Sequence, residues 1–90
     1  MATKAKIGLW NVANKVDGYE FNDFVGLCKH DGLWKVVHLR TGKFMNGHHR
    51  FKKKADCLAF IEKLIAKGFT FDFADVNEME LKNPDWRELI

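Results

Sequence analysis

The residues best suited to chemistry are a basic run, Lys52-Lys53-Lys54, that leads into an apolar segment with helical spacing. A helix N-terminus carries partial positive charge and favours Ser, Thr, Asp or Glu, and each mismatched charge costs about 0.3–1 kcal/mol. Three cations beside backbone N–H groups without helical partners would instead bind phosphate oxygens well. The run therefore predicts an anion-binding surface, and the competing interpretation is a solvated lysine run that aids solubility.

Other basic side chains extend this surface along the preceding part of the chain. The net charge of +3 conceals a separation, because eight Lys or Arg and a single Asp lie between Lys29 and Lys54. All four histidines fall in the same stretch. Such a concentration of charge favours an anionic partner, which we expect to be a DNA or RNA backbone or an acidic protein surface. The predicted contacts are Arg40, Lys43, His48, His49, Arg50, Lys52, Lys53 and Lys54.

Two short resemblances bear on this surface. The sequence KKKA followed by Ala59 and Leu64, after a meander of strands, resembles the end of a double-stranded-RNA-binding domain. That resemblance implies that Lys52 and Lys53 contact phosphates across the major groove. The span from Trp34 to Leu64, with FKKKADCLAF near its end, also resembles the small DNA-binding domains of plant ethylene-response factors and of tyrosine-recombinase N-termini. In those domains three strands lie in the major groove and a helix backs them.

The C-terminal part of the chain has the opposite charge. Six acids and two bases lie between Asp72 and Ile90, interspersed with aromatic and aliphatic side chains. This composition suits a protein-binding tail, with Asp85, Trp86 and Glu88 as its contacts, or a helix that Trp86 docks on the sheet. The alternative function is therefore a small protein-binding inhibitor, of the kind that phages encode against host machinery, which occludes a partner's surface.

Catalytic and metal-binding patterns give weaker candidates. The sequence has no nucleophile elbow, zinc-protease, phosphate-loop or dinucleotide motif. Cys57 lies on an apolar helical stripe, where a thiol is a poor nucleophile. Cys28, His30, His48 and His49 lack the spacing of a structural zinc site, and adjacent histidines on a strand point to opposite faces. We therefore predict a protein that is not an enzyme and holds neither metal nor cofactor.

Length and composition indicate one cytoplasmic domain. Ninety residues, 47% of them apolar, suit a single small globular unit. No apolar run reaches the roughly 20 residues that span a bilayer, and no secretory signal stands at the N-terminus. The two cysteines are expected to be free thiols in a reducing compartment. We expect no membrane association, and either a monomer or a homodimer.

Alternating apolar residues predict the strands that position the basic surface. Asp31-Gly32 is a preferred two-residue hairpin connection, so the strands on either side of it should pair. The segment Gly8–Gly18 partly repeats Gly32–Gly42, through convergent strand patterning or through duplication of a hairpin. We expect a turn at Asn14–Gly18 and a basic meander over residues 24–51, with strands at Ile7–Ala13, Phe24–His30, Leu33–Leu39, Lys43–Met45 and His48–Phe51.

The spacing of apolar residues becomes helical after the basic run. It predicts a main helix over about 54–67, which Gly68 ends. Phe69, Phe71 and Phe73 alternate with polar residues, which predicts a strand over about 69–74 whose exposed edge would favour dimerisation. In the acidic segment 75–90, Asn83 as N-cap and the proline after it predict a short last helix.

These elements predict an α+β fold. It consists of an antiparallel sheet of four to five strands, with the main helix packed on one face and a short C-terminal helix. The expected core comprises Leu27, Trp34, Val36, Phe51, Leu58, Ile61, Ile65, Phe69 and Phe71.

Overall fold

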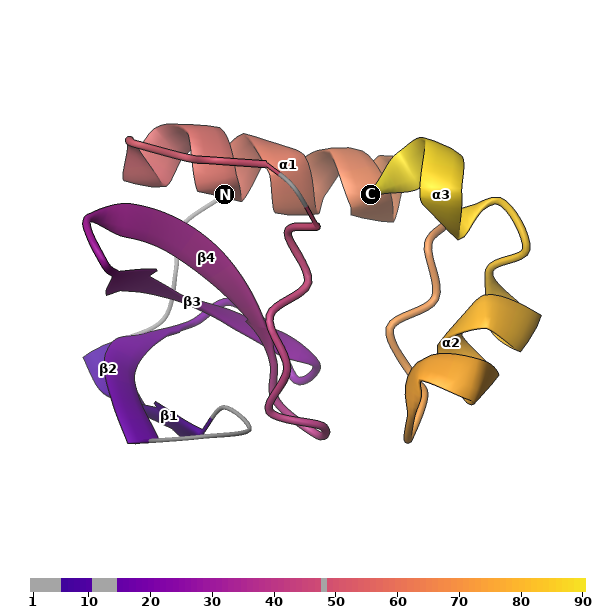
Figure 1. Ribbon diagram of the computed structural model, residues 1–90, viewed down its shortest axis with the longest axis horizontal. Helices are drawn as coiled ribbons and strands as arrows, with labels where there is room; N and C mark the ends of the chain where they lie inside the picture. Colours follow the sequence, from indigo (N-terminus) through magenta and orange to yellow (C-terminus); the bar gives the residue numbers. More distant parts are fainter. Residues whose placement is uncertain (1–5, 11–14, 48) are drawn as a thin grey trace.

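The described residues, 6–10, 15–47 and 49–90, form a four-stranded antiparallel sheet followed by three helices in the computed structural model (Figure 1). This arrangement confirms the predicted α+β fold, with four strands. In this part of the chain no helix combines the length and the apolar character needed to cross a bilayer. The elements are β1 (Lys6–Trp10), β2 (Lys15–Glu20), β3 (Val25–His30), β4 (Leu33–His38), α1 (Lys54–Ala66), α2 (Val76–Lys82) and α3 (Trp86–Leu89).

The hairpin of β3 and β4 forms as predicted. Asp31 and Gly32 have φ angles of 53° and 78°, and a tight two-residue turn of this hand needs positive φ at both positions. The register pairs Leu27 with Val36, and both side chains belong to the main core beneath α1. The Cys28 side chain points to the opposite face of the sheet. There it packs with Leu9 and Val37 in a smaller cluster. The period of two along each strand thus divides the apolar residues between two cores.

The predicted turn at Asn14–Gly18 is wrong, because β2 begins at Lys15 and pairs with both β1 and β3. Gly18 serves close packing instead of a turn. A Cβ atom there would lie 2.8 Å from Leu9 Cδ1 and 2.5 Å from the Leu27 carbonyl oxygen. Leu9 fills that space and is almost completely buried. The end of the strand predicted at Ile7–Ala13 lies outside the described residues.

A connector, defined as residues 39–53 without His48, covers the free edge of β4. The strands predicted at Lys43–Met45 and His48–Phe51 do not form. Each is replaced by an isolated β-bridge, Phe44 with Val37 and Phe51 with Trp34. His48 itself lies outside the described residues. The backbone N–H of Trp34 donates to Phe51 at 2.7 Å, and that of Met45 donates to Val36 at 2.8 Å. The edge of the sheet therefore has hydrogen-bond partners without a regular fifth strand.

α1 matches the predicted main helix and packs on the sheet through Cys57, Phe60, Ile61 and Leu64. Ile65 is 41% exposed, so its predicted place in the core is wrong. The buried stripe is rotated toward Phe60, whose ring contacts the connector. The other predicted core residues are either buried, as are Leu27, Val36, Ile61, Phe69 and Phe71, or packed partly buried against the core, as are Trp34, Phe51 and Leu58.

The strand predicted over about 69–74 is wrong, although Phe69, Phe71 and Phe73 are all buried. The segment is extended but has no ladder of hydrogen bonds to the sheet. Side chains satisfy its backbone instead: Asn83 Oδ1 accepts from the Thr70 N–H at 2.7 Å, and its Nδ2 donates to the Thr70 carbonyl at 2.9 Å. Because the three rings face the interior, this segment offers no exposed phenylalanine edge for dimerisation.

Asn83 was predicted as the N-cap of the last helix and instead lies at the C-terminal end of α2, fully buried. Its Nδ2 also donates to the Met79 carbonyl at 3.0 Å. α2 itself was not predicted. Asp75 Oδ1 accepts from the Glu78 N–H at 2.8 Å and caps that helix, and the last helix begins after Asp85. The spacing of Asp75 and Glu78 is the capping signal that could have revealed α2.

His38 connects the end of β4 to the extended segment 69–74, which we call the phenylalanine segment. Its Nε2 lies 2.7 Å from the Phe71 carbonyl oxygen, which can only accept, so Nε2 carries the proton. Its Nδ1 accepts from the Thr41 N–H at 3.3 Å, and its ring stacks on Phe73 with centroids 4.1 Å apart. Burial lowers the pKa of His38; the Phe71 carbonyl opposes this shift, and the charge of Arg40 adds to it. His38 is therefore a neutral structural residue.

Replacing Asn83 with alanine should lower the free energy of unfolding by about 2–4 kcal/mol, because three hydrogen bonds of a buried side chain are lost at once. Urea denaturation followed by circular dichroism measures the change. The matched control is Asn77→Ala, at an exposed position of α2, which should cost no more than about 0.5 kcal/mol. Equal effects of the two substitutions would show that Asn83 does not hold the segment.

Acid should reduce the stability that the buried, neutral His38 ring provides. Because the folded-state pKa is lowered, the contribution of His38 to stability is complete above pH 6.5 and declines as the pH falls below that value. Glutamine cannot titrate, so the stability difference between the wild type and His38→Gln should shrink from about pH 7.5 to about 5.5. Parallel stability curves for the two proteins would contradict this assignment.

Candidate functional site

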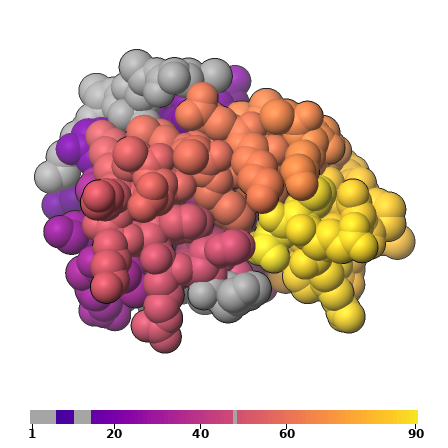
Figure 2. All heavy atoms as spheres, turned by 90° about the horizontal axis from the view of Figure 1, so that it is seen from above, coloured from indigo at the N-terminus to yellow at the C-terminus, as the bar shows by residue number. Residues whose placement is uncertain are grey.

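The start of α1 presents the exposed cations that the sequence predicts. Lys53 is the N-cap, with φ −121° and ψ 140°, and its side chain makes no capping hydrogen bond. An ammonium group has no acceptor with which to cap the helix. Lys52 and Lys53 are both exposed, and among the described residues neither forms an ion pair. Figure 2 shows this outer face, with α1 and the residues that precede it lying side by side.

Lys54 has a different environment from the two lysines before it. Its Nζ lies 3.7 Å from the centroid of the Tyr19 ring and 5.9 Å from that of Trp34. The two rings are themselves 6.3 Å apart, on the face of the sheet that α1 covers. A cation held over aromatic rings is stabilised by their electron-rich faces. Lys54 therefore fixes the start of α1 on the sheet and is only half-exposed.

Lys29, which is not among the predicted contacts, is a further exposed cation. It is the Cα partner of Trp34 in the β3–β4 register, so the two side chains leave the sheet on one face. Its spacing of two residues from the buried Leu27 is the signal that could have placed it there. Arg50 is exposed and immediately precedes Phe51, which bridges to Trp34. We define the basic surface as Lys29, Arg50, Lys52 and Lys53.

Arg40 and Lys43 do not belong to the basic surface. β4 begins beside the start of α1, and these two residues follow its other end, which strand geometry places about 20 Å away. Arg40 Nη1 forms an exposed ion pair with Asp72 at 3.3 Å. Lys43 lies beside a cavity next to the C-terminal segment, which we define as residues 69–90. The predicted contact set therefore separates into two groups.

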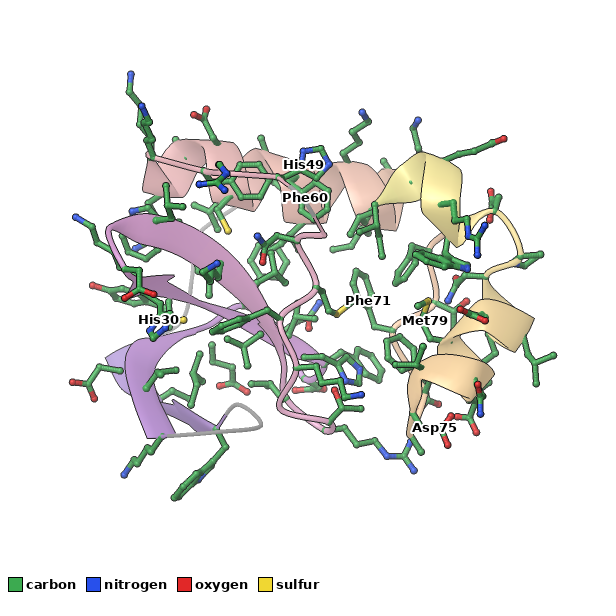
Figure 3. The ribbon with its side chains drawn as sticks, viewed as in Figure 1. His30, His49, Phe60, Phe71, Asp75 and Met79 are labelled. Atoms are coloured by element: carbon green, nitrogen blue, oxygen red, sulfur yellow. The ribbon has the colours of Figure 1, made fainter. Side chains whose placement is uncertain are left out.

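His49 is half-buried against aromatic rings (Figure 3). Its ring stacks on Phe51 with centroids 5.5 Å apart and lies 5.0 Å from Phe60 of α1. This packing orients the connector just before the basic surface. His48, the other predicted histidine contact, lies outside the described residues.

The buried thiols and the described histidines do not assemble into a reactive centre. Burial raises the pKa of Cys57 to about 12, and the neighbouring Cys28 adds to the shift. Burial also raises the pKa of Cys28, against the charge of Lys35. Both thiols are therefore protonated and enclosed. Among the described residues no three His, Cys, Asp or Glu side chains come together to hold a metal ion.

The predicted protein-binding tail is only partly exposed. Asp85 and Glu88 are exposed, but Trp86 packs against the main core, with the Arg87 guanidinium 5.3 Å from its ring centroid. Trp86 therefore helps to dock α3 on the main core. Leu81 of α2, which is not among the predicted contacts, is 82% exposed.

Comparison with protein-family models, with curated proteins and with solved structures finds no significant match to this chain. The two sequence resemblances therefore remain predictions, and the geometry of the side chains carries the functional argument.

Replacing Lys53 with serine should stabilise the protein by about 1 kcal/mol, because serine can cap the helix and removes a cation from its positive end. The matched control is Lys63→Ser in the last turn of α1, where a cation is favourable. We expect this control to leave the free energy of unfolding unchanged or to lower it by about a few tenths of a kcal/mol. Urea denaturation compares the stability of the two variants. A loss of stability in Lys53→Ser would contradict the placement of Lys53 as the N-cap of α1.

Proposed function

We propose that this protein is a non-enzymatic nucleic-acid-binding module of the cytoplasm. Its basic surface would contact the phosphate backbone of DNA or RNA. The observation that carries the proposal is the exposed pair Lys52 and Lys53 at the uncapped start of a 13-residue helix. A residue that lowers stability at its own position is expected where function requires it.

The local electrostatics suit a phosphate group. The first N–H groups of a helix point along its axis beyond the N-terminal end without helical partners, and the helix dipole adds positive potential there. Lys52 and Lys53 stand beside these groups, and Arg50 and Lys29 widen the positive area. The cation–π contacts of Lys54 hold the start of the helix in place, so the surface is ordered before any ligand arrives.

The rest of the fold favours contacts to the backbone over contacts to bases. One face of the sheet is covered by α1, and the other carries the cluster of Leu9, Cys28 and Val37. Neither face is available to lie in a groove as a three-stranded reader. Because phosphate contacts carry no direct sequence information, we propose binding with little base preference.

A second candidate is the protein-binding inhibitor, and one observation favours it. Leu81 stands 82% exposed on α2 beside the exposed Glu80. A large exposed apolar side chain next to an acidic one would suit a basic partner with an apolar groove. In this alternative the C-terminal segment, and not the start of α1, would make the contacts.

Binding of labelled DNA and RNA duplexes across a salt series tests the first proposal. Four cations predict that log K falls with log salt at a slope of about −3 to −4, near −0.9 for each phosphate neutralised. The measurement is fluorescence anisotropy from about 50 mM to about 200 mM salt. Absence of binding at the lower salt concentration would remove the nucleic-acid proposal.

Charge reversal then locates the contacts. The variant Lys52→Glu with Lys53→Glu should bind at least about ten-fold more weakly. Its matched control, Lys63→Glu with Lys67→Glu, changes the same charge at exposed positions at the other end of α1 and should bind much more tightly than the first variant. Equal losses in both would mean that net charge, and not this surface, drives binding.

A further inference from the structure

A cavity of about 170 Å³ lies between the end of β4, the connector and the C-terminal segment. Its walls include Met45 of the connector, Phe73 of the phenylalanine segment, Met79 of α2 and Trp86 of α3. In Figure 3, Met79 points from α2 toward the interior of the molecule. An apolar cavity of about 150 Å³ in another protein is large enough to bind benzene. This cavity can therefore accept one aromatic ring.

The residues around the cavity leave apolar packing contacts unmade. Phe73 stacks on His38 with ring centroids 4.1 Å apart and meets Phe69 edge-on at 6.5 Å. Among the described residues, no ring contact joins Phe73 to Trp86 across the cavity. Protein interiors are normally close-packed, so apolar groups around a space of this size lack contacts that a guest would supply.

The chemistry of the walls favours an aromatic guest. Phe73 and Trp86 offer rings, and pairs of aromatic rings attract each other beyond the effect of the buried area alone. Met45 and Met79 offer thioether sulfurs, which make favourable contacts with ring edges, and methionine side chains adapt their shape to a guest. Trp86 is half-buried and Val76, also in the wall, is 42% exposed, so a guest can enter from solvent.

The polar groups of the walls favour a neutral guest. Both ring nitrogens of His38 already have partners, at 2.7 Å to the Phe71 carbonyl oxygen and at 3.3 Å to the Thr41 N–H. The charged groups of the described lining residues, the Lys43 ammonium group and the terminal carboxylate of Ile90, have opposite signs. Neither an anion nor a cation is therefore selected, and a charged guest would lose hydration without a dedicated partner.

We propose that this cavity binds a small neutral aromatic molecule of a single ring. The ring would lie against Phe73, Met79 and Trp86. The elements around the cavity are held by the hydrogen bonds of His38 and Asn83, so the cavity exists without a ligand. The proposal is independent of the nucleic-acid function, because the cavity and the basic surface lie at opposite ends of β4.

Methyl NMR of the wild-type protein with ¹³C-labelled methionine tests this site directly. Titration with toluene should shift the Met45 and Met79 methyl signals saturably, with a dissociation constant of about 1 mM or lower. Absent shifts, or shifts that do not saturate, would overturn the proposal.

Matched compounds test the two chemical preferences of the cavity. Benzoate and benzylammonium replace the methyl group of toluene with a charged one, and each should bind at least about ten-fold more weakly than toluene. Benzyl alcohol should bind about three-fold more tightly than cyclohexylmethanol, which has the same outline without the aromatic ring. Equal affinity for a charged compound would overturn the neutral preference, and equal affinity for the two alcohols would overturn the aromatic one.

Variants then locate the guest. Met79→Phe should fill the cavity and abolish the toluene-dependent shift of the Met45 signal, with circular dichroism confirming the fold. Its matched control, Leu81→Phe, adds the same ring at an exposed position of α2 and should leave toluene binding unchanged. Met45→Phe fills the cavity from the connector and gives the same test through the Met79 signal. A folded Met79→Phe or Met45→Phe variant that binds toluene as tightly as the wild type would overturn the assignment.

Discussion

Two buried polar side chains, His38 and Asn83, decide how the C-terminal segment attaches to the sheet. The segment buries Phe69, Phe71 and Phe73, but none of the described strands forms a backbone hydrogen bond with it. Buried backbone N–H and C=O groups must nevertheless find partners. The imidazole and the carboxamide supply them, at 2.7 Å to the Phe71 carbonyl and 2.7 Å to the Thr70 N–H. The arrangement of α2 and α3, and the cavity beside them, depends on these contacts.

The basic surface shows how far the sequence predicts where cations lie. A cation run before an apolar helical stripe predicts lysines at the start of a helix, and Lys52 and Lys53 lie exposed there, because local sequence determines where a helix begins. The cation run alone could not show that Lys54 differs from the two lysines before it, because the position of Lys54 depends on aromatic rings from β2 and β4. The charge pattern also could not show that Arg40 and Lys43 lie apart from the other predicted contacts, because this separation follows from the length of β4. Placing Lys29 on this surface required the β3–β4 register, which the alternation of side chains along the strands would have supplied.

The fold was predictable where the local signals were unambiguous, as at the Asp31-Gly32 turn and in α1. It was not predictable where one signal has two physical causes. Gly18 beside an aspartate is typical of a turn, yet here the glycine makes room for the Leu9 side chain. Alternation of phenylalanines indicates a strand, yet the same pattern suits an extended segment whose partners are side chains. The role of Asn83 depends on residues thirteen positions away, which no local pattern reports.

The Asn83 carboxamide takes the place of a strand partner for the phenylalanine segment. Hydrogen exchange at the Thr70 amide, followed by NMR, tests this role most directly, since this N–H has the carboxamide oxygen as its acceptor. We predict protection comparable to that of the β3 and β4 amides, because both would need the same global opening to exchange. Exchange at the rate of an exposed amide would contradict the account.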